Sequence, residues 1–313
     1  MHLVISLCSR QRPDLFFNCL RSILAAPRPD GLEVSVVVVE NEATPSLQEQ
    51  VERFAAEAAI PIHYASEPEL GIPFARNRCV EMALELGADW IAFIDDDEEL
   101  SEAWFEVADR EMRANGATVI TGPYDNILPA PWPTWLGDSS KKEAERISGE
   151  VITTAATNNT LARRHVFAVD GLGLRFDESL RFTGGSDVEL FWRVTTAGEQ
   201  VVWIKDLRVF EHWPAKRLTM KWHLNRTYRV SIGQTKMQMD REGFWKAFWD
   251  RLAKTVGLIL DAAVYVVLGG VVYVADRGRG RRYLFRSLKK LYQSAAIIAA
   301  FAGHTVHPYR SVD

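Results

Sequence analysis

Cysteine is scarce in this chain of 313 residues, and the few copies present argue against two kinds of site. Cys8, Cys19 and Cys79 are odd in number, lie apart along the chain and lack the spacing of metal ligands. A disulfide framework and a cysteine-ligated metal site are therefore not expected. The three thiols indicate a reducing compartment and ordinary packing roles.

Sequence signatures of three other kinds of segment are also missing. No G-x-G-x-x-G turn follows an early strand, which argues against a Rossmann hydride-transfer site. The acidic run at residues 95–99 follows an apolar strand and has no glycine at the sixth position of a calcium loop, which argues against an EF-hand. The apolar stretch at residues 3–7 is too short for a secretory signal and runs directly into Arg10 and Arg12, so no such signal is expected.

Charge is unevenly distributed along the chain, although 47% hydrophobic and 25% charged residues are typical of a globular protein. The length suits one large α/β domain with an appendage, or two modest domains. Residues 1–210 carry 19 basic and 34 acidic side chains, whereas residues 211–313 carry 18 and 7. The basic part is also rich in tryptophan and aliphatic residues, which predicts contact with an anionic membrane surface rather than with nucleic acid.

The central feature of the sequence is an apolar run at residues 90–94 that leads into five consecutive acids. The run has no polar alternation, which is typical of a strand buried on both faces of a mostly parallel sheet. Asp95, Asp96 and Asp97 would follow at its carboxyl end, where open α/β sheets bind ligands. Carboxylates this close repel one another unless they are solvated or share a cation, and Mg²⁺ or Mn²⁺ is the simplest partner. The alternative is an acidic turn that begins a helix.

Strand and helix signals alternate through the first hundred residues. Apolar strands are expected at residues 2–7, 32–39, 62–65 and 90–94, with helices between them at residues 15–26, 46–58 and 73–85. Right-handed crossovers of this kind imply a parallel sheet. Further strands are expected to complete the same sheet at residues 119–122, 151–156, 201–204 and 207–210.

Polar side chains stand where these strands end or where the following helices begin. Ser9, Glu40 and Arg76 occupy such positions, as do the three aspartates at residues 95–97. Each alone is most simply a solvated loop residue, but the carboxyl ends of parallel strands meet at one edge of a sheet. Together these residues predict a site for a nucleotide diphosphate.

Two later segments are candidate parts of the same site. Residues 128–136 hold three prolines and two tryptophans and predict an irregular loop. The loop is either a lid or acceptor-binding loop, through Trp135, or a small satellite core. Residues 184–187 place two glycines before an expected helix start. Asp187 there is a candidate general base, with Glu189 as second choice, or a plain helix cap.

The C-terminal hundred residues differ in composition, with long apolar and amphipathic segments and a basic cluster. An amphipathic helix is expected at residues 244–260, and it overlaps an apolar stretch at residues 256–275 whose one charge is Asp261. Twenty residues of helix span about 30 Å, enough to cross a bilayer, but an aspartate at that depth costs about 3 kcal/mol. Seven basic residues lie between positions 277 and 290, and a further amphipathic helix is expected at residues 283–301.

A series of short motifs, by its order and spacing, resembles the inverting nucleotide-sugar glycosyltransferases of family 2, most closely the branch with succinoglycan-type exopolysaccharide enzymes. The motifs span roughly residues 1–235. They are Cys8-Ser9-x-x-Arg12-Pro13, Val39-Glu40-Asn41, Gly71-Ile72-x-x-Ala75-Arg76-Asn77-Arg78, Asp95-Asp96-Asp97, Gly122-Pro123, Trp135-Leu136, Thr157-Asn158-Asn159, Arg175-Phe176-Asp177, Gly184-Gly185-Ser186-Asp187 and Pro214-x-x-Arg217.

The resemblance implies a fold, a reaction and site residues. The fold is α/β and GT-A-type: a Rossmann-like, mostly parallel sheet with helices on both faces, followed by C-terminal amphipathic and hydrophobic helices. The reaction moves a sugar from a nucleotide-diphosphate sugar, UDP favoured, to a glycan acceptor, with Asp187 as general base. The donor residues are Ser9, Arg12, Glu40, Arg76, Asp95 and Asp96; Asp97 and Asp95 hold Mn²⁺ or Mg²⁺; Trp135, Gly185 and Ser186 contact the acceptor.

Three positions depart from the family's pattern. Glu40 stands where aspartate is usual, one methylene longer, which bears on the preference for uridine. Ser186 replaces the customary glutamate before the base, which bears on acceptor contacts. Arg10 replaces a usual tyrosine.

Two other functions use the same residues. A sugar nucleotidyltransferase would release pyrophosphate and needs a basic residue near a triphosphate, but no glycine-rich basic loop follows the first strand. An inactive sugar-nucleotide-binding module of a membrane assembly would use Asp187 only as a helix cap.

The expected domain organisation is a catalytic domain at residues 1–235 and a helical, membrane-associating region at residues 236–313. Asp261 and the glycine pair at 269–270 argue against a simple span, so the prediction is a peripheral, monotopic or re-entrant attachment to the cytoplasmic face of the membrane. A lipid-linked oligosaccharide is then the expected acceptor. The alternative is a soluble protein whose C-terminal helices pack on the catalytic domain or form a dimer interface.

Overall fold

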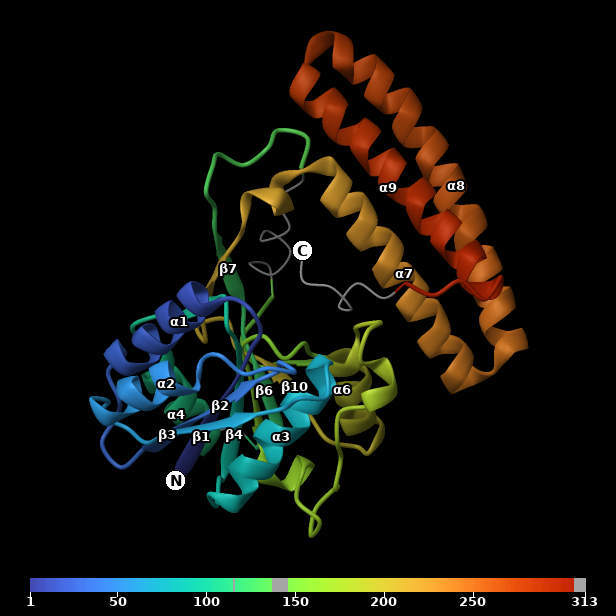
Figure 1. Ribbon diagram of the computed structural model, residues 1–313. Helices are drawn as coiled ribbons and strands as arrows, with labels where there is room; N and C mark the ends of the chain where they lie inside the picture. The colour runs from blue at the N-terminus through green and yellow to red at the C-terminus, as the bar shows by residue number, and fades with distance from the viewer. Residues whose placement is uncertain (115, 137–145, 307–313) are drawn as a thin grey trace.

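The computed structural model describes residues 1–114, 116–136 and 146–306 (Figure 1). An N-terminal α/β unit is built on an eight-stranded sheet, and long C-terminal helices lie to one side of it. The strand order in the sheet is β3-β2-β1-β4-β9-β6-β10-β8. In chain order these strands are β1 (His2–Ser9), β2 (Glu33–Glu40), β3 (Ile62–Ser66), β4 (Trp90–Asp95), β6 (Val119–Thr121), β8 (Glu150–Ile152), β9 (Thr160–Arg163) and β10 (Val201–Trp203).

The sheet is parallel where the sequence predicts it to be and mixed beyond that point. β1 runs parallel to β2 and β4, and β2 runs parallel to β3, which confirms the arrangement expected for the first four strands. β9 is antiparallel to β4 and β6, and β8 is antiparallel to β10. The parallel part is buried on both faces because its apolar residues do not alternate with polar ones.

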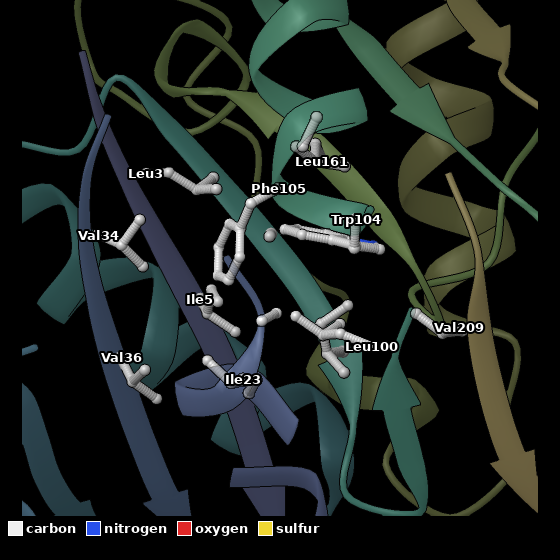
Figure 2. Close-up of a cluster of buried hydrophobic side chains, with 14 of the residues drawn as sticks. Leu3, Ile5, Ile23, Val34, Val36, Leu100, Trp104, Phe105, Leu161 and Val209 are labelled. Atoms are coloured by element: carbon white, nitrogen blue, oxygen red, sulfur yellow. The ribbon is translucent and has the colours of Figure 1, made fainter. Parts of the chain in front are cut away.

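Helices cover both faces of the sheet. They are α1 (Pro13–Ala25), α2 (Gln48–Ala56), α3 (Ile72–Glu85), α4 (Trp104–Ala114) and α6 (Ser186–Thr196). α1, α2 and α4 pack on one face, where Trp104 and Phe105 lie among Leu3, Ile5 and Val34 (Figure 2). α3 and α6 pack on the other face, against side chains such as Val4. α4 is absent from the sequence-based expectations.

A second sheet of three strands corrects one prediction. β11 (Val209–His212) was expected to complete the main sheet, but it pairs instead with β5 (Glu98–Leu100) and β7 (Tyr124–Ile127). Both edges of β10 are already occupied, by β6 and β8, so the main sheet offers no place beside it. The turn at Asp96 and Asp97 carries the chain from the first sheet to the second.

Asn159 joins the two sheets from a fully buried position with φ of 53°. Its Oδ1 accepts the indole N–H of Trp104 at 2.8 Å, and its Nδ2 donates to the carbonyls of Pro123 at 3.0 Å and Leu207 at 2.6 Å. At Gly122 an added Cβ would lie 1.9 Å from the Leu207 carbonyl oxygen. The chain therefore passes between the sheets only with a small residue at position 122.

The C-terminal part consists of a short 3₁₀ turn, η3 (Ala215–Leu218), and the helices α7 (Met220–Glu242), α8 (Phe244–Ala275) and α9 (Arg277–Phe301). α7 was not expected, α8 is one helix where two overlapping segments were expected, and α9 begins before residue 283. The expected domain boundary at residue 235 lies inside α7. In the described part of the chain, α8 alone is long and apolar enough to cross a membrane, and only 17% of its most apolar window is buried.

α8 and α9 form a closely packed helical hairpin (Figure 1). An added Cβ at Gly269 would lie 2.8 Å from the Leu284 side chain, and one at Gly280 would lie 2.4 Å from Tyr273 Cα. The Ser287 hydroxyl donates to the Ala262 carbonyl at 2.8 Å. Small residues thus let the two backbones approach. Gly269, which weakens a simple membrane span in the sequence, has this packing role.

An aromatic cluster connects the hairpin to the α/β unit. Trp135, from the proline-rich loop, lies 4.6 Å from the ring of Phe285 on α9 and 5.7 Å from that of His223 on α7. Trp132 of the same loop lies 5.8 Å from Trp213. Burial lowers the pKa of His223 to about 4, so its imidazole is neutral at pH 7. The loop therefore forms the satellite core that was one of its two expected roles.

Candidate functional site

The parallel strands bring three of the predicted side chains to one sheet edge. β1, β2 and β4 end at Ser9, Glu40 and Asp95. Ser9 lies opposite Glu40 in the β1–β2 pair, and Cys8 lies opposite Asp95 in the β1–β4 pair. The register of a parallel sheet therefore sets these strand ends side by side, where ligands of such sheets bind.

An acidic cluster, defined as Asp95, Asp96, Asp97 and Glu98, occupies the turn after β4. Asp96, Asp97 and Glu98 are only 7%, 6% and 1% exposed. The Ser9 hydroxyl donates to Asp96 at 3.0 Å, and Glu98 accepts the backbone N–H of Asp95 at 2.9 Å. Asp96, Asp97 and Glu98 are thus withdrawn from solvent, whereas the Asp95 side chain is 44% exposed.

Three guanidinium groups face this acidic cluster. Arg12 lies 3.4 Å from Asp96 and 3.3 Å from Asp97, and Arg76 lies 3.4 Å from Asp95. Arg217 lies 3.1 Å from Asp97 and also pairs with Glu211. Arg217 is not among the predicted site residues, although it belongs to the Pro214-x-x-Arg217 motif of the family pattern.

Burial dominates the electrostatics of the acidic cluster. It raises the pKa of Asp96 to about 7 and raises the pKa values of Asp95 and Asp97, while nearby arginines oppose the effect. Burial raises the pKa of Glu98 well above its usual value. The arginines therefore leave negative charge uncompensated, and a bound cation would stabilise the ionised carboxylates.

Asp187 lies in the first turn of α6, after Gly184 and Gly185 with φ of 78° and 89°. Its Oδ1 accepts the backbone N–H of Val188 at 2.8 Å. Its charge contributes to the raised pKa of Asp95, so Asp187 lies near the acidic cluster. The chain can turn into α6 here because Gly184 and Gly185 adopt positive φ, which glycine tolerates.

The neighbours of Asp187 face α7. An added Cβ at Gly185 would lie 3.3 Å from the sulfur of Met237 on α7, and Ser186 is 1% exposed. Glu189, the second choice as base, is bound by Arg193 at 2.7 Å. Arg241 of α7 lies 3.9 Å above the ring of Trp192 on α6. The start of α6 thus lies between the acidic cluster and α7.

Glu40 has a network of its own rather than a free carboxylate. It is 1% exposed and accepts the backbone N–H groups of Ser46 at 2.8 Å and Leu47 at 3.0 Å. The Tyr64 hydroxyl donates to it at 2.6 Å. Burial and this carboxylate raise the pKa of Tyr64. Both oxygens of Glu40 therefore already bind groups of the protein.

The predicted Trp135 lies outside the network around the acidic cluster, because it packs in the aromatic cluster described above. His212, at the end of β11, lies at the edge of the network: it is 2.7 Å from Glu99, and its backbone N–H donates to the Asp97 carbonyl at 2.9 Å. The second sheet therefore supports the Asp97 turn through its backbone.

The acidic cluster fits a divalent cation shared with a ligand better than a preformed metal cage. No group of three His, Cys, Asp or Glu side chains within the described residues is placed to hold a metal by itself. Mg²⁺ and Mn²⁺ need only one or two carboxylates when phosphate oxygens and water complete the shell. Asp97, which is 6% exposed, and Asp95, whose side chain is 44% exposed, are suitable donors and lie 3.1–3.4 Å from guanidinium groups.

Solved structures of similar fold define the class. TarS 1–349 of S. aureus in complex with UDP has a TM-score of 0.55 and 12% sequence identity to this chain. The match covers 97% of this chain and 92% of the TarS chain. The complex of the same protein with UDP-GlcNAc also has a TM-score of 0.55, with 10% sequence identity. The match covers 97% of this chain and 93% of the TarS chain. The structure of GalNAc-T7 with UDP, GalNAc and Mn²⁺ has a TM-score of 0.52 and 13% sequence identity to this chain. The match covers 75% of this chain and 50% of the GalNAc-T7 chain. The fold is that of the GT-A glycosyltransferases.

Sequence comparison narrows this class to a family. The family model described as glycosyl transferase family 2 matches residues 4–177. The succinoglycan biosynthesis protein ExoM of Rhizobium meliloti (strain 1021) is 30% identical over 290 residues, which is 92% of this chain and 90% of ExoM. The chain belongs to glycosyl transferase family 2, as the motifs predicted, and it is a glycosyltransferase.

Proposed function

We propose that this enzyme moves a sugar from a nucleotide-diphosphate sugar to a glycan hydroxyl, with inversion at the anomeric carbon, during the synthesis of an exopolysaccharide. The observation that carries the proposal is the meeting of the acidic cluster, three guanidinium groups and the Asp187 helix start at one sheet edge. The relative ExoM acts in succinoglycan biosynthesis, and structural neighbours bind UDP and UDP-GlcNAc. A UDP-sugar is therefore the favoured donor.

The donor diphosphate lies among Arg12, Arg76 and Arg217 in this proposal. Asp97 and Asp95 would hold Mn²⁺ or Mg²⁺, which would supply positive charge against the diphosphate. On donor binding the guanidinium groups exchange aspartate oxygens for phosphate oxygens, which they bind in the same geometry. Asp96, held by Ser9, faces the ribose.

Asp187 is the general base in this mechanism. It accepts the proton of the acceptor hydroxyl as the oxygen attacks the anomeric carbon from the side opposite the diphosphate. The guanidinium groups stabilise the departing diphosphate, and no covalent intermediate forms. Gly185 and Ser186 line the acceptor side, next to Met237 of α7.

Glu40 and Trp135 have indirect parts in the proposal. Glu40 orders the turn at Ser46 and positions Tyr64 beside the nucleoside, since its own oxygens are occupied. Trp135 fixes the loop at residues 128–136, on the acceptor side, to α7 and α9 through the aromatic cluster.

The location proposed for the enzyme is the cytoplasmic face of the membrane, with a lipid-linked oligosaccharide as acceptor. Residues 1–235 form the catalytic domain, and residues 236–313 form the region that associates with the membrane. The support is α8, whose apolar residues are mostly exposed, together with the basic side chains of α9.

Product analysis with radiolabelled nucleotide sugars tests the reaction. The expected result is a labelled glycan and free UDP, lost on addition of EDTA and restored by Mn²⁺ or Mg²⁺. Release of pyrophosphate from a sugar phosphate and a nucleoside triphosphate would indicate a nucleotidyltransferase instead. Binding without turnover over a broad donor and acceptor panel would indicate a binding module. Full activity in excess EDTA would contradict the metal assignment alone.

A further inference from the structure

We infer that the α8–α9 hairpin lies flat in the surface of an anionic lipid bilayer, with α8 immersed to the same depth along its whole length and crossing nowhere. The inference rests on the membrane attachment proposed above and decides between its possible geometries. It follows from the exposed residues of α8, from the packing of α9 along α8 and from the chemistry of the two hairpin ends.

The first argument is a continuous apolar stripe on α8. Its nine members are 41–89% exposed and recur at intervals of three or four residues: Trp245, Trp249, Leu252, Val256, Leu260, Val264, Val267, Val271 and Val274. At that spacing they share one face of the helix. The stripe extends over about 44 Å, which exceeds the hydrocarbon core of about 30 Å. A helix that crossed the bilayer along its normal would leave the ends of the stripe outside the hydrocarbon core.

The second argument is that α8 cannot enter the bilayer without α9. The two helices touch from one end of the hairpin to the other: Phe244 lies 5.6 Å from Phe301, and Lys290 lies 2.6 Å from Asp261. α9 carries seven basic residues between positions 277 and 290. Each cation costs about 3 kcal/mol at the bilayer centre, so α9 stays at the level of the headgroups and holds α8 there.

The third argument is that both hairpin ends have the chemistry of the interface. Trp245 and Trp249, at the start of α8, are 71% and 62% exposed, and tryptophan prefers the headgroup level. The opposite end carries the exposed Arg277, Arg279 and Arg281, which anionic headgroups attract. Both ends therefore suit the headgroup level, which is that of one leaflet because the cations of α9 hold the hairpin at one surface, and the lipid that fits them is an anionic phospholipid.

Flotation with vesicles tests the surface and its lipid. The full chain is expected to float with phosphatidylcholine–phosphatidylglycerol vesicles, and far less with phosphatidylcholine alone. Leu260→Glu, in the stripe, is expected to lower partitioning roughly 30-fold or more. Val169→Glu replaces a 94% exposed apolar residue of the α/β unit with the same charge and is expected to change partitioning less than threefold. Failure of the wild-type chain to float, or equal effects of both variants, would overturn the assignment of the stripe as the membrane-binding surface.

Depth measurements test the orientation. A nitroxide label is placed on one introduced cysteine at a time, in Trp249→Cys, Leu260→Cys and Val271→Cys, and its depth is read from collisions with oxygen and with a nickel chelate. Equal depths are expected. A label at 260 that is deepest, with shallow labels at 249 and 271, would overturn the flat geometry in favour of a span. Three water-exposed labels, or a stripe covered in a dimer detected by light scattering, would overturn the membrane surface.

Transferase activity provides a separate readout. It is measured without vesicles, with a water-soluble acceptor analogue, for the wild-type chain and for Leu260→Glu. The variant is expected to keep wild-type activity in this assay while it loses vesicle binding. Loss of both together would contradict the assignment of the stripe to the membrane. Absence of transfer by a wild-type chain that floats would instead contradict the proposed function.

Discussion

The α/β unit and the α8–α9 hairpin place charged and apolar side chains in opposite ways. In the α/β unit, Asp96, Asp97 and Glu98 are at most 7% exposed, and the large apolar residues form the core. In the hairpin, Val271 and Val274 are 68% and 89% exposed. The first arrangement suits a protein that excludes water from a polar ligand, and the second suits a protein whose surroundings are themselves apolar.

The two regions are also held together by different residues. The core of the α/β unit contains large side chains such as Trp104 and Phe105, packed against the sheet (Figure 2). The hairpin is held by small residues, Gly269 and Gly280, that bring two helices close together. Close packing of small residues leaves the large apolar side chains of α8 free to face outward. The comparison shows that the exposed apolar residues of α8 follow from the way α8 and α9 pack against each other, through small residues.

The largest expected effect is on sugar transfer and comes from a substitution in the α/β unit, not in the hairpin. Asp187→Asn keeps the size of the side chain and removes its basicity, so transfer should fall about 100-fold or more while donor binding persists. Initial rates and calorimetric binding of the UDP-sugar measure the two. Glu189→Gln is the comparison, expected to have a much smaller effect because Arg193 already binds that carboxylate. Near-wild-type turnover in Asp187→Asn would remove the residue from the base role.

The next prediction concerns the arginines on Asp97. Arg217→Met should lower the free energy of unfolding by about 3 kcal/mol, because it leaves Asp97 and Glu211 without their shared buried partner. Arg12→Met should cost less, since the Arg12 side chain is 44% exposed against 16% for Arg217. Urea denaturation of both variants measures the difference. Equal losses would show that burial does not decide the strength of these pairs.

A smaller effect, per pH unit, is expected in the pH dependence of stability. The pKa of Asp96 is raised to about 7 in the folded protein, so the folded state holds this proton more tightly than the unfolded state. Stability should therefore fall as the pH rises from about 4 to about 7, by at most about 1.4 kcal/mol per pH unit for this group. Urea titrations at several pH values, without metal, measure it. Asp96→Asn should flatten the curve, and an unchanged slope would contradict the assignment.

The smallest effect is expected in the hairpin. Asp261 and Lys290 form a close pair, but their side chains are 58% and 25% exposed. In detergent-free buffer, Lys290→Met should change the free energy of unfolding by less than about 1 kcal/mol. Thermal denaturation measures it, with Asp261→Asn as the partner variant. A loss of several kcal/mol would mean that the hairpin resembles the α/β unit in how it uses charge.

The elements that the sequence predicts well are those with local signals. β1, β2 and β4 are apolar runs without alternation, and their strand ends are predicted correctly to within two residues. β11 was assigned to the wrong sheet because its partners, β5 and β7, are set by a distant junction. α7 was missed because polar residues such as Thr235 are buried in it, which hides the helical period.

The candidate site divides in the same way. Position in the sequence places Ser9, Arg76 and the aspartate run at the strand ends, and the structure brings them together. Arg217 reaches Asp97 across 120 positions of the chain, and no local pattern reports such a contact. The occupation of Glu40 by Ser46, Leu47 and Tyr64 also depends on the tertiary structure. The catalytic and metal-binding roles of these residues stay predictions.

Asn159 has a consequence for how the enzyme unfolds. A single buried amide binds α4 through Trp104 and both strand connections of the second sheet through Pro123 and Leu207. Removal of the second sheet from the first would leave the Asn159 Nδ2 without its two carbonyl partners, which is costly for a buried amide. We therefore expect the two sheets to exchange their backbone amide hydrogens as one cooperative unit. The Asp97 turn connects the two sheets, so we expect it to open only when the whole unit unfolds, unlike a surface loop.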